Sequence, residues 1–150
     1  MTTLINKSRL SPRLPAHCPI KKVLIVEDDA GMRFLIRQAL APRGFMCLEA
    51  EDGMTAMNIL EDRHVDLIIT DYELPGWDGL ELLRQIARRP RLARSKTIFL
   101  SGKADDEVFL ALVRHKVVDA VITKPFEVQQ FTKMIFQLLE KPHRDSVLVS

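Results

Sequence analysis

The sequence predicts an α/β fold in which a five-stranded parallel sheet is covered by helices on both faces. Three observations support this prediction: five short apolar runs, five segments of helical pattern that alternate with them, and short connections throughout. Strict alternation of this kind favours parallel pairing, because each helix returns the chain to the edge where the next strand begins. The length of 150 residues allows one domain with a sizeable core.

The five apolar runs are predicted to be strands that helices bury from both sides. Two of them read LIIT and TIFL, which are continuous and partly β-branched, as is typical of strands covered on both faces. The predicted strands are residues 23–26, 45–48, 67–70, 97–100 and 120–123.

Five further segments carry helical periodicity. In the first, Phe34, Leu35 and Ala39 are predicted to face the core. Arg33 and Arg37 are predicted to face solvent. The predicted helices span residues 31–41, 54–60, 80–88, 105–114 and 128–139.

Two of the later helices show a clear apolar spacing. Leu80, Leu83 and Ala87 stand three and four residues apart and are predicted to form one buried face. Phe131 and Ile135 are predicted to face inward from the last helix.

Five strands in about 120 residues match the flavodoxin-like doubly wound fold, with strand order 2-1-3-4-5. We take the strand order from that fold, because the residues alone do not specify which strands are neighbours. Residues 1–20 are expected to form a flexible basic leader, residues 21–140 the folded domain, and residues 141–150 a short C-terminal tail.

Charge and hydropathy exclude several classes of protein. The net charge is +2, but residues 1–22 hold five basic residues and no acid, and residues 23–140 have an excess of acids, so the net charge does not indicate nucleic-acid binding. No apolar run approaches the roughly 20 residues that span a bilayer, and the first residues lack a secretory core. We therefore expect a cytoplasmic protein that contacts neither DNA nor membrane.

Polar side chains follow four of the predicted strands, at the sheet edge where ligands bind in open parallel sheets. Crowded carboxylates need a cation or a proton between them, and oxygen ligands suit Mg²⁺. One aspartate is then a candidate nucleophile for a phosphoryl group, whose oxygens the lysine and the hydroxyl can bind. These residues are Asp28 and Asp29 after the first strand, Asp71 after the third, Ser101 after the fourth and Lys124 after the fifth.

Two acids near this edge have a second interpretation. Asp29 could equally cap the first helix, as an Asp after a strand often does. Glu27 precedes the acidic pair and could point elsewhere, so the predicted ligand set does not include it.

The residues 21–140 resemble the receiver domains of two-component response regulators. The resemblance rests on four blocks at family-like separations: VLIVEDDAGMR, LIITDYELPGWDG, IFLSG and ITKPF. It implies that Asp71 is the phosphorylated aspartate. It further implies that Asp28, Asp29 and Asp71, with the backbone carbonyl of Glu73, hold Mg²⁺.

The same resemblance assigns the two residues that contact the phosphoryl group. Ser101 matches the hydroxyl residue that turns towards it, and Lys124 matches the lysine that pairs with it. The bond from Lys124 to Pro125 is typically cis in the family. One departure is Val121, three residues before the lysine, where many members have Tyr or Phe. A valine there does not supply the aromatic part of the family's signalling switch.

The resemblance implies a phosphoacceptor that takes its phosphoryl group from a histidine kinase or a histidine phosphotransfer protein. We expect the chain to catalyse only its own phosphoryl transfer and dephosphorylation. We expect no output domain after residue 139, and therefore expect signalling through protein contact or phosphorelay. The family's partner face is the fourth helix, fifth strand and fifth helix, which here offers Phe109, Leu112, Val113 and Val117.

Three alternatives stay open. A receiver-shaped module that signals without phosphorylation is kept open by Val121. A magnesium-dependent phosphohydrolase usually has a second acid two residues after its nucleophile, and Glu73 supplies one. The basic stretch at residues 84–96 is either a solvated surface or a docking site for an acidic partner or nucleic acid. The solvated surface is favoured because the stretch has no interleaved aromatic residue for base stacking.

Overall fold

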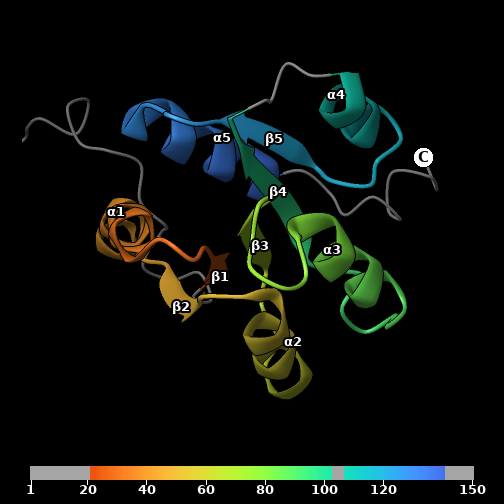
Figure 1. The fold of residues 1–150 in the computed structure, drawn as a ribbon. Helices are drawn as coiled ribbons and strands as arrows, with labels where there is room; N and C mark the ends of the chain where they lie inside the picture. The colour runs from red at the N-terminus through yellow and green to blue at the C-terminus, as the bar shows by residue number, and fades with distance from the viewer. Residues whose placement is uncertain (1–20, 103–106, 141–150) are drawn as a thin grey trace, which may run out of the picture.

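The computed structural model describes residues 21–102 and 107–140, and within them the chain forms a five-stranded sheet. The strand order is β2-β1-β3-β4-β5 and every neighbouring pair is parallel (Figure 1), so the predicted fold class and order are confirmed. The strands are β1 (Lys22–Val26), β2 (Met46–Ala50), β3 (Leu67–Asp71), β4 (Lys96–Ser101) and β5 (Ala120–Thr123). The helices are α1 (Ala30–Leu40), the 3-10 turn η3 (Ala41–Arg43), α2 (Gly53–Asp62), α3 (Gly79–Ala87), α4 (Glu107–Arg114) and α5 (Val128–Glu140).

Three predicted features lie outside the described residues. They are the leader at residues 1–20, the tail at residues 141–150 and the start of the helix predicted at residues 105–114. In the part of the chain that the structure describes, no helix is both long and apolar enough to cross a membrane.

Two apolar layers pack on opposite faces of the sheet. Successive strand residues point to opposite faces, and β1 shows this clearly. Val23 and Ile25 enter the layer beneath α1 and α5, whereas Leu24 and Val26 enter the layer beneath α2, α3 and α4 (Figure 1). All five residues of the central strand β3 are buried, as the run LIIT predicts.

The inward face of α1 differs from the prediction. Ile36, Ala39 and Leu40 are buried. Phe34 and Leu35, predicted to be core residues, are 54% and 41% exposed. These five apolar residues spread over about 240° of the helix, so periodicity alone does not decide which stripe meets the sheet.

The inward face of α3 is also displaced from the prediction. Leu83 is buried as predicted, but Leu80 is only half-buried and Ala87 is exposed. The buried stripe is completed by Leu82 and Ile86. One residue along a helix turns the direction of a side chain by about 100°, which accounts for the difference.

Aromatic contacts orient α5 as predicted. Phe131 and Ile135 are buried, and the ring of Phe131 stacks on that of Phe126 with centroids 4.6 Å apart. Phe45, predicted to begin the second strand, lies just before β2. Its ring packs edge-on against Phe136 of α5, with centroids 5.4 Å apart.

Gly79 sets the close approach of α3 to the end of β3. Its N–H donates to the carbonyl oxygen of Tyr72 at 2.8 Å. A Cβ atom at this position would lie 2.7 Å from the carbonyl oxygen of Asp71 and 2.9 Å from the ring of Phe99. The first of these neighbours is backbone and cannot move without displacing Asp71.

We therefore expect Gly79→Ala to lower the free energy of unfolding by about 1–3 kcal/mol through overpacking. Urea denaturation followed by circular dichroism measures the change. Gly102→Ala is the matched control, because nothing lies within 4 Å of a Cβ atom there. Equal midpoints for the two variants would contradict the steric account.

Candidate functional site

Three carboxylates meet at the carboxyl edge of the sheet. One oxygen each from Glu27, Asp28 and Asp71 lies within 4.8 Å of the others, the arrangement expected of a cation site. Glu27 and Asp71 are 1% and 7% exposed, whereas Asp28 is exposed. The cluster therefore has two buried members, Glu27 and Asp71, and one exposed member, Asp28.

Strand register explains why Glu27 and Asp71 are neighbours. β1 and β3 pair in parallel, and their last registered pair is Val26 with Thr70. Glu27 and Asp71 follow one step further and have the same parity as Ile25 and Ile69 in their strands, so both side chains point to the same face. The N–H of Glu27 still donates to the carbonyl oxygen of Ala50 at 3.0 Å, which keeps it in line with β1.

Asp29 is not part of this cluster, and its predicted role as a metal ligand needs correction. Its carboxylate caps α1 by accepting a hydrogen bond from the N–H of Gly31 at 2.9 Å. Its own N–H donates to Glu27 Oε2 at 3.1 Å. The alternative interpretation of Asp29 as a helix cap therefore holds, and Glu27, absent from the predicted ligand set, takes its place beside Asp28.

Arg33 holds the loop that carries these acids. It is predicted to face solvent, but its side chain is only 17% exposed. Its Nη1 donates to the carbonyl oxygen of Glu27 at 2.7 Å, and its Nε donates to Glu49 Oε1 at 3.2 Å. Arg33 thus ties the end of β1 to β2.

Lys124 reaches the cluster from the end of β5. Its Nζ donates to Glu27 Oε1 and to Asp71 Oδ2, each at 2.8 Å. Its side chain is 25% exposed. One ammonium group therefore joins the two most buried carboxylates, and the sequence prediction that Lys124 and Asp71 lie together agrees with this geometry.

The pKa values reflect the crowding. Burial raises the pKa of Glu27 from 4.5 to about 7, and the neighbouring Asp28 and Asp71 also raise it. The hydrogen bonds from Lys124 and from the N–H of Asp29 lower this pKa but do not outweigh burial. Burial alone would lower the pKa of Lys124, but its bonds to Asp71 and Glu27 outweigh this and raise it. A cation bound at this cluster would favour the ionised form of Glu27, because it would offset the neighbouring negative charges.

The remaining predicted residues lie at the same edge of the sheet as Asp71. Ser101 is buried at the end of β4, where its carbonyl oxygen accepts from the N–H of Lys124 at 2.8 Å. The N–H of Glu73 donates to Asp71 Oδ1 at 3.2 Å. The bond between Lys124 and Pro125 is cis, as the resemblance implied. Metal binding by the carbonyl of Glu73 stays a prediction.

An aromatic cluster that sequence reasoning missed stands next to Asp71. The ring of Tyr72 packs edge-on against Phe99 and Phe109, with centroids 5.7 and 5.0 Å away. Val121 is half-buried against the same apolar layer. Because Phe109 lies on α4, these rings connect the residue after Asp71 with that helix. The three aromatic residues are scattered in the sequence, and only the fold brings them together.

Comparison with known proteins agrees with the resemblance found in the sequence. The chain matches the model of the response regulator receiver domain over residues 23–136. It is 31% identical over 121 residues to the chemotaxis protein CheY of Pseudomonas aeruginosa, a match that covers 80% of this chain and 97% of that protein.

Two further relatives extend the comparison. The chain is 34% identical over 121 residues to the phosphate regulon transcriptional regulatory protein PhoB of Pseudomonas aeruginosa; the match covers 81% of this chain but only 52% of PhoB, so the chain spans about half of that relative. The structure is similar to that of the response regulator protein TrrA of Thermotoga maritima in complex with Mg²⁺–BeF, with 26% identity and a TM-score of 0.69 over 79% of this chain and 99% of TrrA.

Proposed function

Because this chain belongs to the family of response regulator receiver domains, we propose that Asp71 accepts a phosphoryl group and that the chain signals through the phosphorylated state. One observation supports this above all others: the carboxylate of Asp71 lies in one cluster with Glu27 and Asp28 and forms an ion pair with the ammonium group of Lys124. The family implies such an acceptor, and the cluster supplies the charges that the reaction needs.

Asp71 is the proposed nucleophile. A carboxylate oxygen of Asp71 bonds to phosphorus while the bond from phosphorus to the donor breaks, so that an acyl phosphate replaces the donor's phosphoryl linkage. The Oδ2 atom is already bound by Lys124, whose positive charge is well placed to bind a phosphoryl oxygen. The hydroxyl of Ser101 is the proposed partner of another phosphoryl oxygen.

The acidic residues fit a magnesium ion. Glu27 and Asp28, together with Asp71, offer only carboxylate oxygens, and Mg²⁺ prefers a few such ligands and keeps its remaining waters. When bound, the ion would offset the negative charge that otherwise repels a phosphoryl group. The Thermotoga maritima relative, whose structure contains Mg²⁺ and BeF, supports this choice of metal.

The proposed partners follow from the family. The donor is a histidine kinase or a histidine phosphotransfer protein, and the chain catalyses only its own phosphorylation and dephosphorylation, in the cytoplasm. Output passes to a protein partner through α4, β5 and α5, where Val113 and Val117 are exposed while Phe109 is buried in the core. Direct contact with DNA is not proposed for these residues.

A turnover assay separates a phosphoacceptor from a phosphohydrolase. We expect the chain, incubated with Mg²⁺ and p-nitrophenyl phosphate, to release no p-nitrophenol above the background of a catalytically unrelated protein. A phosphohydrolase with an Asp nucleophile would release it continuously, at typical rates of about 1 per second or more. Continuous release that disappears in Asp71→Asn would contradict the proposed function.

A further inference from the structure

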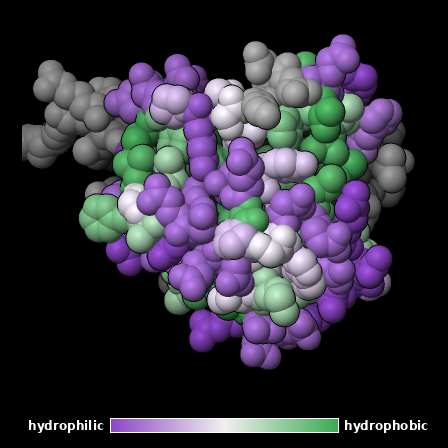
Figure 2. Space-filling model, in the orientation of Figure 1, coloured by the Kyte–Doolittle hydropathy of each residue, from purple (hydrophilic) through white to green (hydrophobic). Residues whose placement is uncertain are grey.

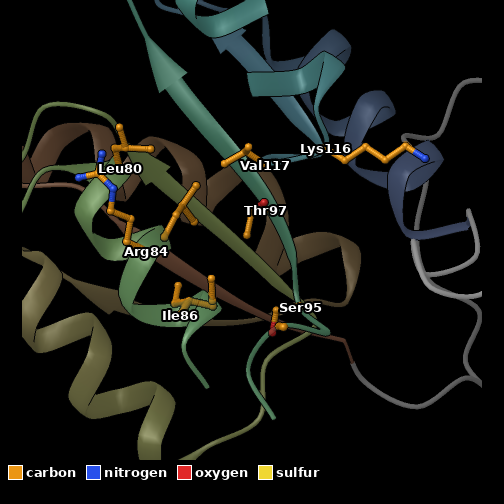
Figure 3. Close-up of a pocket in the computed structure, with 10 residues that line it drawn as sticks. Leu80, Arg84, Ile86, Ser95, Thr97, Lys116 and Val117 are labelled. Atoms are coloured by element: carbon orange, nitrogen blue, oxygen red, sulfur yellow. The ribbon is translucent and has the colours of Figure 1, made fainter. Parts of the chain in front are cut away.

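A groove lies between α3 and the turn that joins α4 to β5 (Figure 3). Its volume is about 300 Å³, at the lower end of the roughly 300–1,000 Å³ typical of ligand pockets. It runs along α3 from Leu80 to Ala87, a distance of about 10 Å or two helical turns. Ser95 and Thr97 line it from the start of β4, the end of that strand opposite to Ser101 and the acidic cluster.

The floor of the groove is aliphatic. It is formed mainly by Leu80, Leu83, Ile86 and Ala87 of α3, with Val117 opposite them. Val117 is 42% exposed, and Figure 2 shows hydrophobic side chains gathered over α4 and towards α3. An aliphatic hollow of this size accommodates one or two large apolar side chains of a partner.

The rim of the groove is basic. Arg84 and Lys116 line it, and Figure 3 shows them on opposite sides with their charged ends directed outward from the hollow. Arg88 and Arg94, both exposed, directly follow lining residues of the groove. No carboxylate is found among the lining residues in the described part of the chain. We call Arg84, Arg88, Arg94 and Lys116 the basic rim.

The structure divides the basic stretch at residues 84–96 into two groups. Arg89 donates to the carbonyl oxygen of Gln85 at 2.8 Å, Arg91 donates to the carbonyl oxygens at the end of α2, and Lys96 is buried. These three basic residues therefore have structural roles within the domain. Arg84, Arg88 and Arg94 are exposed on its surface, and the nearby carboxylate of Glu81 is bound by Gln85 and Arg84.

We propose that this groove docks an acidic helical segment of a partner protein, with leucine-type side chains in the hollow and carboxylates against the basic rim. A helix that lays its apolar face in a groove is a common mode of recognition, and complementary charge at the rim adds specificity and faster association. The groove lies apart from Asp71, so the proposal does not rest on phosphorylation.

Charge argues against the other occupants. A second copy of this chain meeting the groove with its own groove would bring two basic rims together, which repel. Residues 141–150 hold Lys141 and Arg144 against Asp145 alone and would add positive charge to a positive rim. A nucleic acid would find no aromatic side chain to stack on among the lining residues of the described chain.

Two synthetic peptides test the proposal on the full chain. The first is a helical peptide with leucines on one face and glutamates on the other, and the second has lysines in place of the glutamates. We expect the first to shift the NMR amide signals of the groove, to bind more weakly as salt is added and to lose about threefold in affinity in Arg84→Gln. The matched control is Lys133→Gln, an exposed lysine on α5, with unchanged affinity.

Each other outcome overturns the proposal. Equal binding of both peptides, or signal shifts confined to other surfaces, would show that the basic rim does not select an acidic partner. Shifts of the groove signals on dilution, without peptide, would assign the groove to a second copy, and shifts caused by Leu148→Ser would assign it to the chain's own last residues. Phosphorylation of Asp71 stays the same in all of these outcomes, so a failure here leaves the proposed function standing.

Discussion

Asp28→Asn is expected to lower the affinity for Mg²⁺ by at least about tenfold, because it removes one of three clustered negative ligands. Asp29→Asn is expected to change it by no more than about twofold, because Asp29 caps α1 and asparagine caps a helix equally well. NMR titration with MgCl₂, following the amides around Asp71, measures both affinities.

The pair of variants separates two assignments of the acidic ligands that the sequence alone does not distinguish. Both substitutions remove one charge, and they lie next to each other, so long-range charge effects nearly cancel between them. Glu27→Gln belongs with Asp28→Asn and is expected to weaken Mg²⁺ binding to a similar degree. A larger loss in Asp29→Asn than in Asp28→Asn would contradict the cluster described above.

Lys124→Gln is expected to act in the opposite direction and to raise the affinity for Mg²⁺, on the order of tenfold. The ammonium group lies 2.8 Å from oxygens of both Glu27 and Asp71, so it competes with the metal for the same carboxylates. Without Mg²⁺ the same change leaves buried Glu27 without its ion partner. We expect a loss of about 1–3 kcal/mol in the free energy of unfolding in EDTA.

Two titrations check this prediction. Mg²⁺ binding is followed by NMR, and unfolding by urea is followed with EDTA and again with excess Mg²⁺. Lys133→Gln on α5 is the control for loss of a lysine, and Lys124→Arg is the control that keeps the charge. An affinity for Mg²⁺ in Lys124→Gln that is unchanged or lower would contradict competition between lysine and metal.

The strands could be predicted from the sequence because their composition is unambiguous. Runs such as LIIT are apolar on both sides, and in the structure every residue of β3 is indeed buried. The inward faces of α1 and α3 could not be predicted correctly, because in each helix the apolar residues form an arc wider than the stripe that the sheet buries. Which stripe is buried depends on where the sheet lies, as exposed Phe34 and buried Ile36 show.

The candidate site could be predicted in part. Asp71, Asp28 and Lys124 meet as expected, whereas Glu27 and Asp29 exchange their predicted places. Three consecutive acids look alike as a motif, but Glu27 continues the alternation of Val23 and Ile25 and therefore points with Asp71. Asp28 and Asp29 lie beyond the end of β1, where alternation no longer decides which of them joins the cluster. The helix cap at Asp29 was a second available signal.

Other parts of the site depend on contacts between distant segments. The bond from Arg33 to the carbonyl oxygen of Glu27, and the edge-on packing of Tyr72 with Phe109, join residues whose proximity no local pattern indicates. The position where many family members have an aromatic residue holds Val121 in this chain. The rings of Tyr72 and Phe109 nevertheless connect the residue after Asp71 with α4.

The central claim is that Asp71 carries the phosphoryl group, and intact mass after incubation with acetyl phosphate and Mg²⁺ tests it most directly. The account predicts a mass increase of one phosphoryl group that is lost on mild alkaline treatment, that requires Mg²⁺ and that is absent in Asp71→Asn. An unmodified mass for the folded parent chain, or an adduct that persists in Asp71→Asn, would contradict it.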